Sequence, residues 1–281
     1  MKKLIILSSV IFFTLLCSCS GQKNSDTISK TEREKSKSLV LYYSQTGATR
    51  QVAEEIQKQL GADIDSIMPV ESYGYDYDAT IERWRKEKED SVKVAIKPLS
   101  RNINEYDTIF LGFPIWGGTY ASPVATYLAD NSLDGKTVIT FATFGSGGIE
   151  NATKNVIASQ PGSKVIEGYG VRNARTSKVP AEINRWLIEK GYKNGEISVL
   201  PGYGEELPVN EKEKIIFKEA TDGYRFPLGT PVLVARRGFE GTMDYKFDAI
   251  STAPDGQEVK SVIYVTVSPN EKPEFTRVVR E

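Results

Sequence analysis

The sequence has no histidine and only two cysteines, Cys17 and Cys19. The lack of histidine excludes a Ser-His-Asp triad, and the scarcity of cysteine also excludes zinc sites built from these two residue types. Both cysteines lie close to the N-terminus, so the rest of the chain has no thiol for nucleophilic or disulfide chemistry. A protein with so few reactive groups either only binds or takes its chemistry from a cofactor.

The sequence also has no excess of positive charge. Its 36 Lys and Arg residues stand against 37 Asp and Glu residues, which gives a net charge of −1. We therefore expect no nucleic-acid partner. At 281 residues the chain is longer than one typical domain, so we expect two.

The apolar run at residues 4–16 is too short to cross a bilayer as a helix and has the length of the apolar part of a signal peptide. It ends in Leu16-Cys17-Ser18-Cys19, which resembles a bacterial lipobox. The resemblance implies that residues 1–18 are a removed signal peptide and that Cys19 carries a lipid. The protein would then be anchored to a membrane of the bacterial cell envelope, facing the periplasm. An ordinary cleaved signal peptide is the alternative. Residues 19–37 are polar and are expected to form a flexible tether.

Short apolar runs alternate with amphipathic or charged segments between Ser38 and Gly191. The apolar runs predict strands at residues 39–43, 62–67, 108–113, 137–142 and 164–169. The segments after them predict helices at residues 50–60, 80–90, 123–130, 151–159 and 180–190. Five such repeats predict an α/β domain over residues 38–193, with an open parallel sheet and helices on both faces. Sheets of this kind bind ligands at the carboxyl ends of their strands.

The first predicted strand runs into Ser44-Gln45-Thr46-Gly47-Ala48-Thr49 and then into a helix. Hydroxyls around a glycine at a helix N-terminus predict an anion-binding loop, because the amides, the helix dipole and the hydroxyls all favour an anion. The loop lacks the lysine of a P-loop and the glycine spacing of a dinucleotide-binding fingerprint. Capping of the helix by a hydroxyl is the alternative interpretation.

Two further loops follow predicted strands. The third strand ends in Pro114-Ile115-Trp116-Gly117-Gly118, and the fourth in Thr143-Phe144-Gly145-Ser146-Gly147-Gly148. The glycines allow a ligand to approach the backbone closely. We expect Trp116 to offer a flat face for stacking and not to fill the core; a surface Trp covering a helix end is the alternative. With the anion-binding loop, these loops predict a flat ligand that carries a phosphate.

With these three loops, residues 38–191 resemble the flavodoxin family, and within it the short bacterial flavodoxins. The resemblance implies a doubly wound, five-stranded parallel sheet of order 2-1-3-4-5 and bound FMN. It implies that residues 44–49 bind the FMN phosphate, that residues 114–118 pack on the isoalloxazine ring, and that residues 143–148 form a second ring-contacting loop. Many flavodoxins have an aromatic residue in this last loop, where the present chain has glycine and serine. The segment Tyr73–Asp78 is either another source of an aromatic ring or an exposed loop.

Residues 200–281 show a different pattern. A predicted helix at residues 209–220 precedes predicted strands at residues 231–235, 242–249 and 261–267, so we expect a small α+β domain. The segment Arg237–Phe247 resembles the central hairpin of cystatin-like domains. Because Arg237 and Phe239 depart from that family's pattern, we expect a role in contact or packing and no inhibition of proteases.

The function that these features favour is electron transfer by an FMN-binding lipoprotein. Its partner would be an unknown redox protein or a small-molecule electron acceptor, and we expect neither a catalytic side chain nor a bound metal. We rank this function above that of a substrate-specific oxidoreductase. One alternative is an FMN-dependent reductase of quinones or small molecules. The other is a non-catalytic interaction module with a vestigial flavin site.

Overall fold

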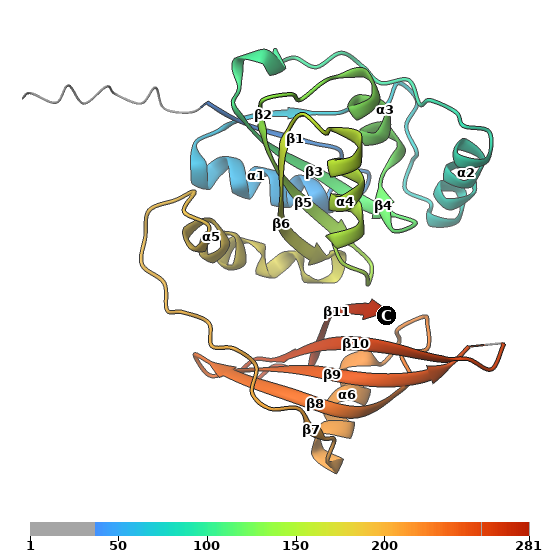
Figure 1. Ribbon diagram of the computed structural model, residues 1–281, viewed down its shortest axis with the longest axis vertical. Coiled ribbons are helices and arrows are strands. Elements are labelled where there is room, and N and C mark those ends of the chain that lie inside the picture. Colours follow the sequence, from blue (N-terminus) through green and yellow to red (C-terminus); the bar gives the residue numbers. More distant parts are fainter. Residues whose placement is uncertain (1–36, 254, 281) are drawn as a thin grey trace, which may run out of the picture. The chain divides into compact units, whose positions relative to one another are not determined.

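The computed structural model describes residues 37–253 and 255–280 (Figure 1). The predicted signal peptide (residues 1–18), the predicted lipidated Cys19 and all but the last residue of the predicted tether (residues 19–37) lie outside the described residues. Within the described part of the chain, no helix is long and apolar enough to cross a membrane.

The first part of the described chain is built on a parallel sheet. Its strands are β1 (Ser38–Tyr42), β2 (Asp63–Ser66), β3 (Thr108–Trp116), β5 (Thr137–Phe144) and β6 (Lys164–Arg172). Their order is β2-β1-β3-β5-β6, which confirms the predicted order 2-1-3-4-5, since β4 (Thr119–Tyr120) is a short strand antiparallel to β3. The side chains of Leu39, Val40 and Leu41 are all fully buried. A strand covered on both faces needs such a continuous apolar run, which is why β1 was predictable.

Helices cover both faces of this sheet (Figure 1). They are α1 (Ala48–Leu60), α2 (Tyr77–Glu89), α3 (Ser122–Asp130), α4 (Glu150–Ser159) and α5 (Val179–Glu189). The apolar side chains of α1 and α5 pack in one hydrophobic cluster, and those of α3 and α4 pack in another on the opposite face. In α1, Val52, Ala53 and Ile56 are buried at the helical spacing that the sequence predicted.

The second part of the described chain is an antiparallel sheet with one helix. Its strands are β7 (Leu207–Pro208), β8 (Thr230–Phe239), β9 (Thr242–Thr252), β10 (Glu258–Val267) and β11 (Glu274–Arg280). Helix α6 (Glu211–Thr221) places Ile216 and Phe217 in the hydrophobic cluster of this sheet. The predicted helix and three strands are confirmed, and the structure adds β7 and β11. The resemblance to cystatin-like domains stays a prediction.

The residues from 37 onward form a single compact unit that includes both sheets. Strand β11 contacts β6 of the parallel sheet. The predicted boundary between residues 193 and 200 falls between α5 and β7, so it separates the two sheets along the chain.

Candidate functional site

The three predicted loops follow β1, β3 and β5, which are neighbours in the parallel sheet. Because the strands are parallel, their carboxyl ends lie at the same edge and the loops meet there. The Thr49 and Thr143 hydroxyl oxygens are 2.8 Å apart and link the first loop to the third. Before the first two loops, the Tyr43 amide donates to the Gly112 carbonyl oxygen of β3 at 3.0 Å and continues the pairing of β1 with β3. The structure therefore brings together the residues that the sequence predicted as one site.

The N-terminus of α1 keeps its hydrogen-bond donors free of side-chain caps. Gly47 stands at the N-cap position with φ 96°, in the left-handed region, and no side chain caps the helix. The first intrahelical bond runs from the Gln51 amide to the Gly47 carbonyl oxygen, so the amides of Ala48, Thr49 and Arg50 have no acceptor within the helix. The first turn contains no acidic residue. This geometry fits an anion-binding loop and contradicts the alternative of capping by a hydroxyl.

The hydroxyls of this loop differ in environment. Thr46 is exposed, whereas Thr49 is buried and its hydroxyl is paired with that of Thr143. In such a pair one hydroxyl donates to the other, and the accepting hydroxyl keeps its own proton for another partner. Ser44 is half-buried, and its Oγ accepts from the Gly47 amide at 3.2 Å. Thr46 is thus the hydroxyl most open to a ligand.

The Gln45 side chain is turned away from the amides of α1. Its Nε2 donates to Thr80 Oγ1 at 2.6 Å and to the Gly74 carbonyl oxygen at 3.1 Å. These bonds fix the anion-binding loop to the start of α2. Only the backbone of Gln45 is therefore left to bind an anion. The sequence alone did not indicate that the side chain binds α2 instead.

Trp116 lies at the end of β3, in a hairpin with β4. The turn residues Gly117 and Gly118 have φ values of 54° and 81°, a backbone shape that favours glycine in two-residue hairpin loops. Pro114 and Ile115 are half-buried in β3. These residues lie at the predicted edge of the sheet.

The expectation that Trp116 would present an open face is not met. Its side chain is only 8% exposed and belongs to the hydrophobic cluster under α3 and α4. Its ring makes edge contacts with the rings of Tyr43, at 5.8 Å between centroids, and Tyr73, at 4.8 Å. The physical reason is that three large aromatic rings meet at this point and exclude water from one another. Stacking of Trp116 on a ligand therefore requires movement within this cluster.

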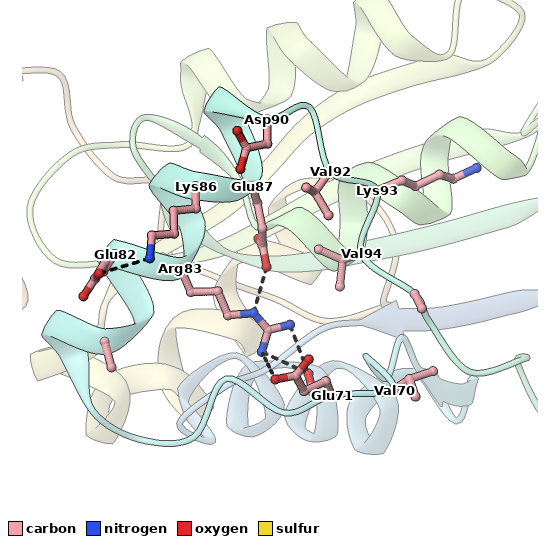
Figure 2. Close-up of a pocket in the computed structure, with 12 residues that line it drawn as sticks. Val70, Glu71, Glu82, Arg83, Lys86, Glu87, Asp90, Val92, Lys93 and Val94 are labelled. Carbon is pink, nitrogen blue, oxygen red and sulfur yellow. Dashed lines mark hydrogen bonds and ion pairs between the residues drawn. The ribbon is translucent and has the colours of Figure 1, made fainter.

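Tyr73 is held by charged residues of α2. Its hydroxyl donates to the Glu87 carboxylate at 2.6 Å, and the Arg83 guanidinium lies 3.9 Å from its ring centroid. Arg83 also pairs with Glu87 at 2.8 Å; Figure 2 shows its guanidinium between the carboxylates of Glu87 and Glu71. Burial, together with the hydrogen bond to Glu87, raises the pKa of Tyr73. Of the segment Tyr73–Asp78, Tyr73 is therefore part of the core, while Tyr75 is 84% exposed.

The cavity in Figure 2 has a volume of about 590 Å³ and lies between α2 and residues 92–95. Its lining includes Glu82, Arg83, Lys86, Glu87 and Asp90, so it is mixed in charge. None of the residues in the three predicted loops lines it. This cavity is therefore separate from the candidate site.

The third loop is residues 143–148, and its last four residues, 145–148, are called the glycine-rich loop below. Thr143 and Phe144 before it are buried, and Ser146 is half-buried. A Cβ added at Gly145 or Gly147 would meet no atom within 4 Å, whereas one at Gly148 would overlap the Glu150 carboxylate. The backbone at Gly145 and Gly147 is therefore open to the close approach of a ligand.

The contacts that hold the glycine-rich loop were not predicted. The Arg172 Nε donates to the Gly145 carbonyl oxygen at 2.7 Å, and the Val278 amide donates to the Ser146 carbonyl oxygen at 2.9 Å. Burial lowers the pKa of the Arg172 guanidinium. Arg172 ends β6 and Val278 lies in β11, so no local sequence pattern connects either residue to the loop.

A family model described as flavodoxin matches residues 37–190. No curated protein gives a significant match to the chain. Among solved structures, the chain is similar to a protein of Bacteroides eggerthii described as a flavoprotein, at 32% identity, with 54% of this chain and 98% of that chain covered and a TM-score of 0.46. It is also similar to a flavoprotein of Lactobacillus acidophilus in complex with FMN, at 23% identity, with 54% and 98% covered and a TM-score of 0.43.

Proposed function

Because this chain belongs to the flavodoxin family, we propose that its three loops bind FMN and that it transfers electrons at a membrane. The observation that carries the proposal is the N-terminus of α1, with its uncapped amides, left-handed Gly47 and exposed Thr46. This is a site for a phosphate, and the hairpin and the glycine-rich loop lie at the same edge of the sheet.

The residues of the first loop and of the glycine-rich loop fit FMN, and each of these two loops would hold a different part of it. The amides of Ala48 and Thr49 and the hydroxyl of Thr46 would bind the phosphate, since charge-assisted hydrogen bonds to an anion are the strong ones. The open backbone at Gly145 and Gly147 would lie against the ring. When bound, FMN supplies one- and two-electron redox chemistry, and the protein supplies binding and orientation.

The test of FMN binding compares FMN with riboflavin, which lacks the phosphate. Thr46→Ala should weaken FMN binding by about 10- to 150-fold, the value of one hydrogen bond to a charged group, and should leave riboflavin binding unchanged. Titration calorimetry measures both affinities. Thr252→Ala, which removes an exposed hydroxyl from β9, is the matched control. Equal losses for the two ligands would contradict the proposed role of Thr46.

Electron transfer and substrate reduction are distinguished by steady-state kinetics. The proposal expects the FMN-loaded protein to exchange electrons with a redox protein and to show no sustained oxidation of NADH or NADPH with quinone. Rapid, saturable oxidation of either nucleotide would instead support the reductase alternative.

The membrane location is also a proposal, and it depends on Cys19. The apolar run at residues 4–16 and the Leu16-Cys17-Ser18-Cys19 sequence support lipidation of that residue. Cell fractionation should find the wild-type protein with membranes and the Cys19→Ala protein in the soluble fraction. Cys17→Ala is the matched control and should remain with membranes. A membrane-bound Cys19→Ala protein would contradict the assignment.

A further inference from the structure

We propose that β11 of the antiparallel sheet positions the glycine-rich loop for the flavin, with Arg172 as the positioning residue. The inference rests on the proposed function, because it assumes that this loop contacts the flavin. It gives the C-terminal part of the chain a role at the flavin site.

Two consecutive carbonyl groups of the loop are held from outside the loop. Arg172 binds the Gly145 carbonyl oxygen through Nε and the Phe275 carbonyl oxygen, at 2.6 Å, through Nη1. Its guanidinium also lies 4.3 Å from the centroid of the Phe275 ring. The guanidinium of Arg172 therefore joins the loop to β11, because its Nε binds the loop and its Nη1 binds the strand. The next carbonyl, that of Ser146, accepts from the Val278 amide of β11 itself.

The C-terminal end of the loop is held by a second arginine. Arg277 Nη1 donates to Glu150 Oε1 at 2.6 Å, and Glu150 is the first residue of α4. The Arg277 guanidinium also lies 4.3 Å from the ring centroid of Tyr264 in β10, which limits its freedom. The loop is thus bracketed by Arg172 on one side and Arg277 on the other.

Strand β11 is suited to this role because it is an edge strand. It is the last strand in the order β11-β10-β9-β8-β7, so one of its edges has no neighbouring strand within the sheet. Backbone groups on such an edge are free to bind another segment. The Val278 amide uses this freedom to bind the loop.

Anchoring matters because of the loop's composition. A segment with three glycines among four residues has large conformational freedom, and ordering it on ligand binding costs free energy. Contacts that hold the loop in place before binding reduce that cost. By reciprocity, a ligand that binds the positioned loop must also stabilise the contacts that position it.

The test combines flavin affinity with amide exchange in the full chain. We expect Arg172→Gln to raise the Kd for FMN about tenfold, the lower limit for one charge-assisted hydrogen bond because Arg172 acts on the loop and not on the ligand, and Arg172→Lys to raise it less. The Kd for riboflavin should rise by the same factor, unlike the effect of Thr46→Ala, because the loop faces the ring. In the wild-type protein FMN should slow hydrogen exchange at the Val278 amide, and in Arg172→Gln this effect should largely disappear. Arg225→Gln, at an exposed position, is the matched control.

A second variant tests the contact from β11 itself. Val278→Pro removes the donor to Ser146 but also replaces a buried side chain of the antiparallel sheet, so circular dichroism must first show that the variant is folded. The folded variant should also raise the Kd for both flavins. If the wild-type protein binds no flavin, the proposed function fails, and the inference fails with it. If the wild-type protein binds FMN but the Arg172 and Val278 variants bind it equally well, with unchanged exchange at Val278 in Arg172→Gln, the inference alone is overturned.

Discussion

The buried hydroxyls of Thr49 and Thr143 connect the first and last loops of the site. The two hydroxyls share one hydrogen bond, so replacing one with valine leaves the remaining hydroxyl buried without this partner. We expect Thr49→Val or Thr143→Val to lower the free energy of unfolding by about 1–3 kcal/mol. The double variant should cost less than the sum of the two, since it leaves no unpaired hydroxyl. Urea denaturation followed by tryptophan fluorescence measures all four proteins, and strictly additive losses would contradict the pairing.

The same pair shows what the sequence could predict of the site. The hydroxyls and glycines of residues 44–49 and 143–148 were identified because a short local pattern places them after a strand. Partners from distant segments were not predictable. Tyr73 against Trp116 and Arg172 against Gly145 depend on how remote parts of the chain pack. Trp116 was therefore expected to be open and is buried.

Helix α6 begins with a reciprocal cap that carries a buried charge. The Asn210 side chain accepts from the Glu213 amide at 3.1 Å, and the Glu213 carboxylate accepts from the Asn210 amide at 3.0 Å. Glu213 also pairs with Arg236 of β8. Burial by itself would raise the pKa of Glu213, but the ion pair with Arg236 and the bond from Asn210 outweigh it and lower the pKa. The cap thus fixes α6 to the antiparallel sheet.

The sign of this pKa shift predicts a pH dependence. Because the pKa is lower in the folded state, Glu213 contributes its stability above about pH 4.3, the ordinary range of a glutamate, and loses it as the pH falls. Glu213→Gln should therefore cost about 1.5–3 kcal/mol at pH 7 and much less at pH 3. Urea denaturation followed by circular dichroism at both pH values tests this. Glu211→Gln, in the same turn but exposed, is the control. A loss that is the same at both pH values would contradict the assignment.

The strands of the two sheets were not equally predictable. In the parallel sheet β1, β3 and β5 are largely apolar runs, as expected of strands that are covered on both faces, whereas β2 has the sequence DIDS and a weaker signal. Strand β11, with the sequence EFTRVVR, mixes charged and apolar residues and follows Pro273. It is a strand because residues 274–280 pair with β10 and because Phe275 and Val278 complete the hydrophobic cluster of the antiparallel sheet. The conformation of such a strand is determined by the strand and the core that it packs against, so its own sequence does not predict it.

Contacts between the two sheets should couple their unfolding. In addition to the contacts at the glycine-rich loop, Arg175 pairs with Glu274 at 3.0 Å, Lys178 with Glu271 at 2.9 Å and Arg185 with Glu240 at 3.3 Å. The pairs of Lys178 and Arg185 are largely exposed and contribute about 0–1 kcal/mol each. The side chain of Arg175 is only 12% exposed and is shared with Glu182 of α5, so loss of Arg175 leaves two partly buried carboxylates without their partner.

A ligand that binds the parallel sheet should therefore stabilise the antiparallel sheet as well. Free FMN at 100 times its Kd adds about 2.7 kcal/mol to the stability of the part that binds it. In scanning calorimetry we expect the wild-type protein to unfold in one transition, whose midpoint FMN raises by about 5–10 °C for a chain of this size. Arg175→Gln should divide this into two transitions, of which FMN raises only one. Lys214→Gln, which removes an exposed pair within α6, should behave like the wild type. Two transitions in the wild-type protein, with FMN raising the midpoint of only one, would contradict this prediction. The two sheets would then unfold independently, and FMN would not stabilise the antiparallel sheet through β11.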